Sequence, residues 1–268
     1  MKKLFAVMVA ILAVVMLSGC VEAADKSVLD KVLEEGKITI AVFSDVPPLG
    51  FTDEKNELTG IDVDVAKALA ETLGVKVDFV STTNANRIPY LVSGKVDLVI
   101  ASFTMNPERR KVVEFTNQYF RGGAALVVNG ANPNTSNIKG IADMKGMKIA
   151  VSKGSFNDEV ATKLAGATNE IIRFDNVSDL YQALKSGKAD AIVEDVVLAG
   201  YTIKNMYPEL KTVGDLLSID VWGMGVRRGD QIFLNWLNGF IFDLCSSGKM
   251  AEICAKYGVD YNTVNYAY

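Results

Sequence analysis

Apolar and polar positions alternate with two different periods along this chain, and the period indicates which segments are helices and which are strands. Between residues 27 and 35 the apolar residues recur at helical spacing, and Gly36 follows as a stop signal. Shorter apolar runs bounded by glycine or polar residues indicate strands. Helices are predicted over 27–35, 60–73 and 86–92, and strands over 37–42, 75–80 and 98–102. Helices that alternate with strands indicate an α/β fold.

Two stretches of the chain share the same order of features. Residues 91–102 read LVSGKVDLVIAS, and residues 184–195 read LKSGKADAIVED. In each, a helix end precedes Ser-Gly-Lys, an aspartate and an apolar strand, and a polar residue closes the strand. A second match relates residues 36–42, GKITIAV, to residues 146–151, GMKIAV. Two such matches in the same order predict two lobes of similar construction.

We therefore expect two lobes, each a mostly parallel sheet flanked by helices, joined by two hinge crossings. The expected boundaries are 27–122 and 224–268 for lobe 1, 128–218 for lobe 2, and 123–127 and 219–223 for the hinge strands. Ligands of open α/β sheets bind beyond the carboxyl ends of the strands. Two facing lobes would place Ser102 and Thr104 opposite Asp195 across a cleft.

The N-terminus has the pattern of an export signal. Lys2 and Lys3 precede an unbroken apolar run that ends at Leu17, and Leu17-Ser-Gly-Cys20 follows. This run is shorter than the ~20 residues of a membrane-spanning helix. The four residues resemble a bacterial lipobox, which implies a signal peptide over 1–19, a lipid on Cys20 and a tether over 20–26. An ordinary signal cleaved near residues 21–23 is the alternative.

Composition excludes several classes of function. The chain has 28 basic and 32 acidic residues, and the loss of Lys2 and Lys3 leaves 26 against 32, a net charge of −6, which argues against nucleic acid as a partner. It has no histidine, so zinc sites and histidine-based nucleophile systems are not expected, and we expect no metal or cofactor. Cys245 and Cys254 either pair in an oxidising compartment or remain buried thiols.

The stretch from Gly94 to Arg109 has the features of an anion site. It predicts a buried strand, a polar loop and a helix that starts with Asn106 as N-cap and Pro107 at its first position. Such a turn collects hydroxyl groups, free backbone N–H groups and a guanidinium around one point. This chemistry suits a carboxylate.

These and further motifs together resemble one family. The motifs are Gly60-Ile-Asp-Val-Asp64, Asn86-Arg-Ile-Pro89, Ser93-Gly-Lys-Val-Asp97, Thr104 to Arg109 and Phe115-Thr-Asn-Gln-Tyr119. The pattern is similar to the extracellular solute-binding proteins of bacterial ABC importers, in the family for polar amino acids. The resemblance covers about residues 32–257. It implies a two-lobed periplasmic-binding-protein-like clamp that closes on a free amino acid and delivers it to a membrane permease.

The resemblance also assigns roles to individual residues. Arg109 matches the arginine that binds the ligand α-carboxylate, while Arg110 is interpreted as surface. Ser102 and Thr104 match positions that contact the α-carboxylate or the α-amino group; capping of the loop is their alternative role. Asp195 matches the acid that binds the α-ammonium, and its neighbour Glu194 is interpreted as the outward residue of the strand.

Three further residues complete the expected site. Ser155 opens a helix and either closes over the ligand carboxylate or simply caps that helix. Arg87 matches an arginine of acidic-amino-acid binders, which favours an acidic ligand side chain unless Arg87 pairs with Asp62 or Asp64. Phe43 stands where some acidic-amino-acid binders carry a basic residue, and it either stacks on the ligand or covers the core.

Two other classes of function are compared with transport. Some relatives of this fold are dehydratases that act on cyclic acids, which requires a general acid in the cleft. Asp195 in the ammonium-binding position favours binding over catalysis. A ligand sensor that docks on a separate membrane receptor is the third class. We expect an exported monomer that is not an enzyme, anchored by lipid to the outer face of a membrane or located in the periplasm.

Overall fold

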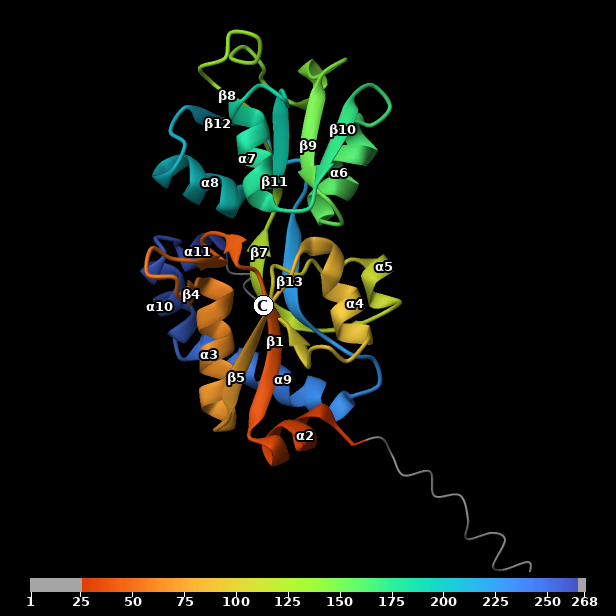
Figure 1. Cartoon of the computed structure of the whole chain (residues 1–268), viewed down its shortest axis with the longest axis vertical. Coiled ribbons are helices and arrows are strands. Elements are labelled where there is room, and N and C mark those ends of the chain that lie inside the picture. The colour runs from red at the N-terminus through yellow and green to blue at the C-terminus, as the bar shows by residue number, and fades with distance from the viewer. Residues whose placement is uncertain (1–25, 265–268) are drawn as a thin grey trace, which may run out of the picture.

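The protein consists of two lobes stacked along the long axis of the molecule (Figure 1). The structure is a computed structural model that describes residues 26–264. The expected signal peptide over 1–19 and the expected lipid site, Cys20, lie outside the described residues. No helix within the described part of the chain is long and apolar enough to cross a bilayer. Each lobe has its own five-stranded sheet, as the internal repeat predicts.

The sheet of lobe 1 has the strand order β5-β1-β6-β13-β7. Its strands are β1 (Lys37–Val42), β5 (Lys76–Ser81), β6 (Leu98–Val99), β7 (Glu114–Gly122) and β13 (Asp220–Val226). β5, β1 and β6 are parallel, while β13 is antiparallel to both its neighbours. A small sheet of β2 (Asp45–Val46), β3 (Gly50–Thr52) and β4 (Leu58–Thr59) accompanies it.

The sheet of lobe 2 repeats this plan in the order β10-β9-β11-β8-β12. Its strands are β8 (Ala124–Asn129), β9 (Lys148–Ser152), β10 (Glu170–Phe174), β11 (Ala191–Asp195) and β12 (Leu210–Val213). β10, β9 and β11 are parallel, and β8 is antiparallel to both its neighbours. The matched sequence stretches form equivalent strands, β1 with β9 and β6 with β11. The prediction of two α/β lobes is confirmed, and each sheet is mixed, with two parallel and two antiparallel strand pairings.

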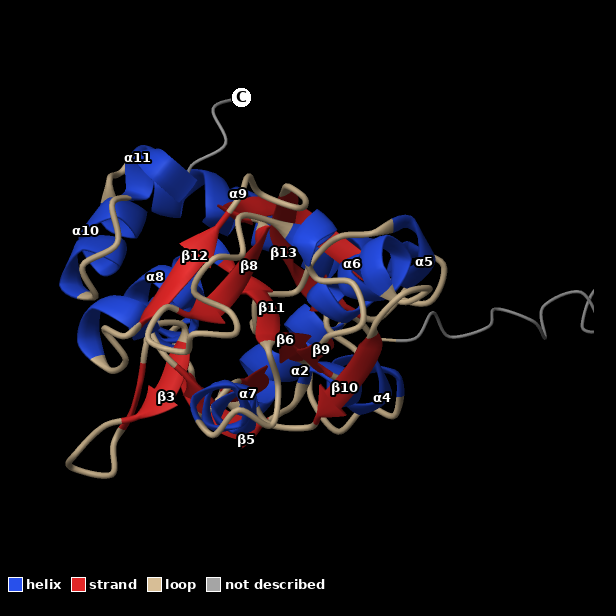
Figure 2. Ribbon diagram, turned by 90° about the horizontal axis from the view of Figure 1, so that it is seen from above, coloured by secondary structure: helices blue, strands red, loops and turns tan. Residues whose placement is uncertain are grey.

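Helices surround the strands of both sheets (Figure 2). In the first half of the chain they are α2 (Val28–Glu35), α3 (Ile61–Leu73), α4 (Arg87–Val92) and α5 (Pro107–Arg110), with a 3-10 turn η1 (Asn84–Asn86) before α4. Lobe 2 has η2 (Ile141–Asp143), α6 (Phe156–Ala165), α7 (Val177–Lys185) and α8 (Val196–Asn205). The C-terminal helices α9 (Gln231–Ser246), α10 (Lys249–Lys256) and α11 (Tyr261–Val264) return to lobe 1.

Local signals end and start these helices where the sequence indicates. Ser27 caps α2 by accepting a hydrogen bond from Leu29, and Gly36 ends it in the left-handed conformation.

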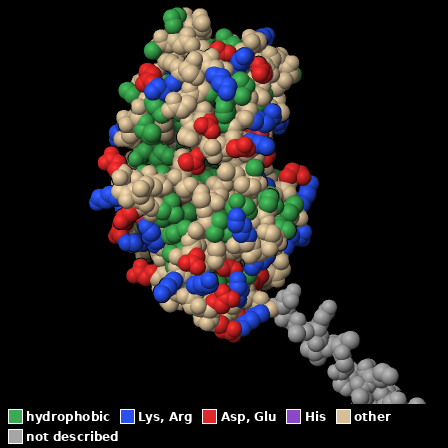
Figure 3. All heavy atoms as spheres, in the orientation of Figure 1, with side chains coloured by type: hydrophobic (Ala, Val, Ile, Leu, Met, Phe, Trp, Pro, Cys, Tyr) green, Lys and Arg blue, Asp and Glu red, His purple; other side chains and the backbone are tan. Residues whose placement is uncertain are grey.

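Acidic and basic side chains are interspersed over the face of the molecule in Figure 3.

The chain crosses between the lobes twice, over segments that differ from the expected ones. We expect hinge strands at 123–127 and 219–223, but β8 pairs along its length with β11 and β12, and β13 pairs with β6 and β7. The first crossing therefore narrows to Gly123, and the second shifts to residues 214–219, between β12 and β13. Buried backbone groups need ladder partners, so the strand-like residues join a sheet rather than span the gap.

Glycines at the first crossing allow close packing against the hinge. A Cβ atom at Gly122 would lie 2.2 Å from Asp195 Oδ2 and 2.6 Å from the Trp222 ring. A Cβ atom at Gly123 would lie 2.6 Å from the carbonyl oxygen of Ser218 on the second crossing. Side chains at these two positions would therefore push the lobes or the crossings apart.

The two cysteines of the C-terminal helices are free thiols in this structure. Cys254 is buried, and burial raises its pKa to about 12. Cys245 is half-buried and accepts a hydrogen bond from the Tyr261 hydroxyl at 3.3 Å. Cys245 and Cys254 are therefore unpaired thiols in this structure and do not form the disulfide that was the other alternative.

Candidate ligand-binding site

A pocket lies between the two lobes, at the carboxyl ends of the central strands. In this closed form its cavity volume is about 30 Å³, enough for about one water molecule. Lobe 1 contributes Phe43, Val46, Asn84, Arg87, Ser102, Thr104, Asp220 and Trp222, and lobe 2 contributes Ser155, Phe156, Asn157, Val177, Glu194, Asp195 and Leu198. Of the seven predicted ligand-binding residues, all but Arg109 line this pocket.

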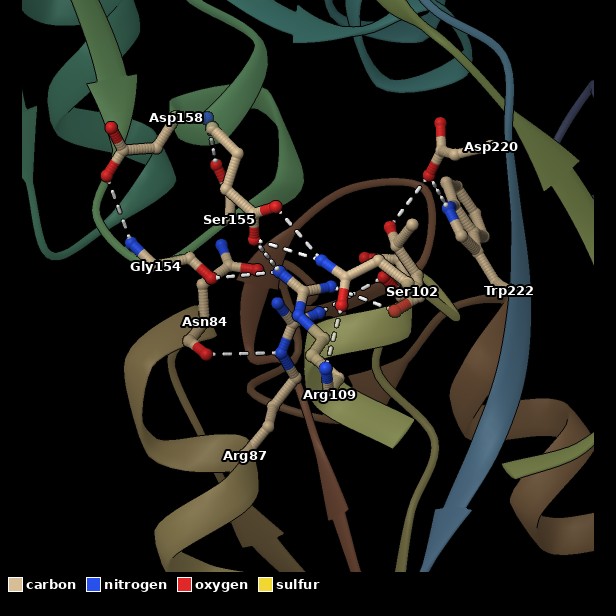
Figure 4. Close-up of polar contacts among 12 residues, drawn as sticks. Asn84, Arg87, Ser102, Arg109, Gly154, Ser155, Asp158, Asp220 and Trp222 are labelled. Carbon is tan, nitrogen blue, oxygen red and sulfur yellow. Dashed lines mark hydrogen bonds and ion pairs between the residues drawn. The ribbon is translucent and has the colours of Figure 1, made fainter. Parts of the chain in front are cut away.

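Hydrogen bonds join the lobes beside the pocket, so the clamp is closed (Figure 4). Asn106 of lobe 1 donates from Nδ2 to both carboxylate oxygens of Glu159 in α6, at 3.1 and 2.9 Å. Arg109 Nη2 donates to the carbonyl oxygen of Gly154 at 3.2 Å and to Glu159 Oε1 at 3.3 Å. These contacts require the two lobes to be in contact and would break on opening.

Arg109 is held in place by the turn that the sequence predicts. Asn106 caps α5 by accepting a hydrogen bond from the Arg109 backbone N–H at 2.8 Å, and Pro107 is the first helical residue. The guanidinium is buried and donates from Nη1 to the carbonyl oxygen of Thr104. Burial lowers its pKa, against the opposing effect of Glu159. Arg109 therefore lies directly behind the pocket wall.

Arg87 lines the pocket and has no ion-pair partner within the described residues. It is 1% exposed, and its guanidinium carbon lies 4.6 Å from the ring centre of Phe103 and 5.8 Å from that of Phe43. Its hydrogen bonds go to the backbone carbonyl oxygens of Asn84, Ala101 and Ser102. Burial and the positive charge of Arg109 lower its pKa well below the ordinary value. Arg87 is thus a buried cation without a bonded carboxylate.

The two acids that could have paired with Arg87 have other partners. Asp62 accepts hydrogen bonds from the Ser102 backbone N–H at 2.9 Å and from the Tyr119 hydroxyl at 2.8 Å. Burial raises its pKa to about 6. Asp64 accepts from Lys256 and Tyr257. The Asp62 contact holds the backbone at the strand end, where Ser102 has a φ of 39°, a strained conformation common at functional sites.

Two carboxylates face the lobe junction next to each other. Asp195 ends β11 and caps α8, accepting from Val197 at Oδ1 and from Gly123 at Oδ2, both at 2.8 Å. Asp220 begins β13, and its Oδ2 accepts from the Thr104 hydroxyl at 2.7 Å and from Trp222 Nε1 at 2.8 Å. Burial raises the pKa of both, and the negative charge of Asp220 raises that of Asp195 further. Within residues 26–264 no acidic or cysteine cluster is suited to hold a metal ion.

Glu194 is part of the pocket wall, which corrects its interpretation as an outward residue. It is 4% exposed, and its Oε1 accepts from Asn157 Nδ2 at 3.0 Å and from the Asp195 backbone N–H at 2.7 Å. Oε2 is buried without a hydrogen-bond partner among the described residues. Burial raises the pKa to about 7. β11 is a central strand with helices on both sides, so all its residues are buried and neither face is outward.

The sequence alone leaves six polar or aromatic lining residues unassigned to the site: Asn84, Phe156, Asn157, Glu194, Asp220 and Trp222. Asp220 had one available signal, because it lies within the hinge strand that the sequence predicts at 219–223. Ser155 lines the pocket and also caps α6, accepting from the Asp158 N–H at 3.0 Å. Both of its expected roles are therefore compatible with its position. Phe43 is 2% exposed and lines the pocket, so it too combines both expected roles.

Comparison with known proteins identifies a family whose sequence pattern this chain shares. The model of the bacterial extracellular solute-binding proteins, family 3, matches residues 38–260. The glutamine-binding protein of an ABC transporter of Bacillus subtilis is 29% identical over 273 residues, which cover 96% of this chain and 97% of the relative.

Solved structures show the same architecture. The structure of a solute receptor for L-cysteine of Neisseria gonorrhoeae has a TM-score of 0.82 and 30% identity, covering 90% of this chain and 100% of that one. An ancestral amino acid-binding protein, described as a precursor of cyclohexadienyl dehydratase, has a TM-score of 0.80 and 33% identity over 86% of this chain and 99% of its own. These similarities confirm the two-lobed clamp.

Proposed function

Because the chain belongs to the bacterial extracellular solute-binding proteins of family 3, we propose that it captures a free polar amino acid between its lobes and delivers it to an ABC permease. The observation that carries this proposal is the charge arrangement of the pocket. A buried guanidinium that forms no ion pair with any residue from 26 to 264, Arg87, shares the pocket with the carboxylates of Asp195 and Asp220. An α-amino acid carries a carboxylate that can pair with the guanidinium and an ammonium that can pair with the two carboxylates.

We assign the α-carboxylate to the guanidinium groups of Arg87 and Arg109. The two lie beside each other (Figure 4), and the charge of Arg109 disfavours the charged form of Arg87. An anion between them would relieve this repulsion and satisfy the buried charge of Arg87. Ser155 lies at the N-terminus of α6, where backbone N–H groups favour an anion. Binding to Arg109 would replace its bond to Gly154.

The α-ammonium is assigned to the carboxylates of Asp195 and Asp220. Both have raised pKa values because they are buried, and Asp195 also because Asp220 is near. A cation between them would offset that repulsion, since opposite charges favour the ionised form. Thr104 already donates to Asp220 and would orient it, and Ser102 lies beside it in the lining.

A second candidate is a ligand with an acidic side chain, which Arg87 would bind in place of the α-carboxylate. The lack of an ion pair at Arg87 favours this candidate, because a second ligand carboxylate would neutralise it. Arg109 alone would then bind the α-carboxylate.

Thermal unfolding of the chain from residue 21 onward, against the twenty amino acids, tests the proposal. A ligand at 1,000 times its dissociation constant stabilises by about 4 kcal/mol, which is roughly 8–16 °C for a protein of this size. A shift of that size with polar amino acids is the expected result. A shift confined to glutamate and aspartate would establish the acidic candidate. No shift with any amino acid would overturn the proposal.

Catalysis is a further candidate because the pocket contains a group suited to general acid chemistry. Burial raises the pKa of Glu194 to about 7, near the working pH of such a group. We propose that the protein binds its ligand without converting it, because the carboxylates of Asp195 and Asp220 are suited to bind an ammonium group. Incubation with prephenate and detection of an aromatic product distinguishes the two, and sustained turnover would replace the binding proposal.

The location of the protein is proposed from its N-terminus and its family. We propose that it is a monomer, exported and anchored by a lipid on Cys20 to the outer face of a membrane or the periplasmic side. Membrane fractionation of the full-length chain and its C20A variant tests the anchor. Equal recovery of both in the membrane fraction would contradict it.

A further inference from the structure

We propose that Glu194 determines ligand specificity by accepting a hydrogen bond from an N–H group on the ligand side chain, so that the preferred ligands carry an amide or cationic side chain. This inference rests on the proposed function, because it needs an amino acid in the pocket. It adds a residue that the sequence places on the outer face of its strand and names the chemistry that the residue selects.

The first observation is an unused acceptor in the pocket wall. Glu194 is 4% exposed, and its Oε2 has no partner among the described residues. A buried polar atom without a hydrogen bond is uncommon in a folded protein and marks a place where a ligand or water completes the site. Since Glu194 lines the pocket, a bound ligand can reach it.

The second observation is that the direction of this acceptor is fixed. Oε1 accepts from both Asn157 and the Asp195 backbone N–H, which ties the carboxyl group to α6 and to the end of β11. Rotation that exchanged the two oxygens would leave the same geometry, with one oxygen used and one free. The free oxygen is therefore preorganised and costs little to use.

The third observation is the charge of the lining, which has three carboxylates, Glu194, Asp195 and Asp220, and one guanidinium, Arg87. In the proposed function, the α-ammonium of the ligand binds to Asp195 and Asp220, and the α-carboxylate binds to Arg87. Glu194 is left for the side chain. A ligand carboxylate there would face a like charge, whereas a cation or an amide N–H would be attracted.

A neighbouring cavity extends the same chemistry. It shares Val177 and Leu198 with the pocket and is also lined by Asp45 and Tyr181. Asp45 Oδ2 and the Tyr181 hydroxyl are buried without hydrogen-bond partners among the described residues. A long cationic side chain that passes Glu194 would find further acceptors in this direction, and an amide would not reach them.

Isothermal titration with glutamine, arginine, glutamate and leucine tests the inference on three proteins: the wild type, E194Q and E194M. E194Q removes the charge and, because its amide oxygen must take the place of Oε1, presents an NH2 group that can still pair with the oxygen of a ligand amide but not with a cation. E194M removes both hydrogen-bonding groups at similar volume. For arginine, both variants should lower the affinity by about 10- to 100-fold, the value of a hydrogen bond to a charged group. For glutamine, E194Q should change the affinity by less than about threefold and E194M by about tenfold. E170Q, an exposed change in the same lobe, is the matched control.

A change in ligand preference separates recognition from a merely structural role. The ratio of glutamate to arginine affinity should rise in E194Q, while a general loss of folding would lower both. D45N should weaken only the long cationic ligand, which distinguishes a cationic from an amide side chain. Preference of the wild type for glutamate or leucine, or unchanged affinities in E194M, would overturn the inference and leave the proposed function intact. Absence of binding to all amino acids would overturn both.

Discussion

At the scale of single residues, the pocket holds charges that the protein itself does not neutralise. In the part of the chain that the structure describes, Arg87 has carbonyl oxygens as partners but no carboxylate, and Glu194 has one oxygen without a hydrogen bond. Buried charges are stable only when they are paired and hydrogen-bonded, or when they become neutral. A pocket that leaves them incomplete is prepared for a ligand that completes them.

The variant R87M should abolish amino-acid binding, and it should also lower stability because three backbone carbonyl oxygens lose their donor. It removes the cation that we assign to the ligand carboxylate, so the affinity should fall by at least about 100-fold, as for a charged pair broken in a buried site. R110M is the matched control, because Arg110 is the exposed neighbour of Arg109 and should bind ligand normally. Calorimetric titration measures both. Equal affinities of R87M and the wild type would remove Arg87 from the site.

At the scale of elements, the close approach of strands β7, β11 and β13 joins the hinge to the pocket. β7 ends at Gly122, against the carboxylate that ends β11 and the Trp222 ring of β13. Asp195 Oδ2 also accepts a hydrogen bond at 2.8 Å from the backbone N–H of Gly123, the residue that follows Gly122. Asp195, to which we assign the ligand ammonium, is therefore positioned by the first crossing itself.

The variant G122A should impair both stability and ligand binding. Its Cβ atom would lie 2.2 Å from Asp195 Oδ2 and 2.6 Å from the Trp222 ring, so one of them must move. Overpacking of this kind costs about 1–3 kcal/mol. G140A is the control, since a Cβ atom there meets nothing within 4 Å. Urea unfolding and titration with the ligand measure the two effects. A G122A protein with wild-type stability and affinity would show that the contact is not restrictive.

At the scale of the whole molecule, closure collects buried carboxyl groups whose pKa values are raised. Burial raises the pKa of Asp62 to about 6 and that of Glu194 to about 7, and it also raises those of Asp45, Asp195 and Asp220. The folded state therefore binds protons more tightly than the unfolded state does. Between about pH 4 and pH 7 unfolding releases protons, so the free energy of unfolding falls as the pH rises.

The protein should accordingly be more stable at pH 5 than at pH 8. Glu194 alone, raised from 4.5 to about 7, contributes on the order of 3 kcal/mol to this difference, because each pKa unit is worth about 1.4 kcal/mol. Urea unfolding at the two pH values measures it, and E194Q should reduce the difference. Equal stability of the wild type at pH 5 and pH 8, or a higher stability at pH 8, would contradict the prediction.

The sequence by itself determined the two-lobed plan and most of the candidate site. Periodicity and the Ser-Gly-Lys repeat are local patterns, and they predicted the equivalent strands β6 and β11 and the Asn106 cap. The family motifs then placed Arg87, Ser102, Thr104 and Asp195 in the pocket. Local physics and a motif suffice where a residue's role depends on its near neighbours in the chain.

Only the tertiary structure decided which distant residues share the pocket and which of them have other partners. Glu194 is buried because helices cover both sides of its sheet, and Asp220 enters the pocket because the second crossing ends there. Asp62 pairs with Ser102 and Tyr119 instead of Arg87. Each of these facts depends on contacts between segments far apart in the sequence, whose geometry no local pattern encodes.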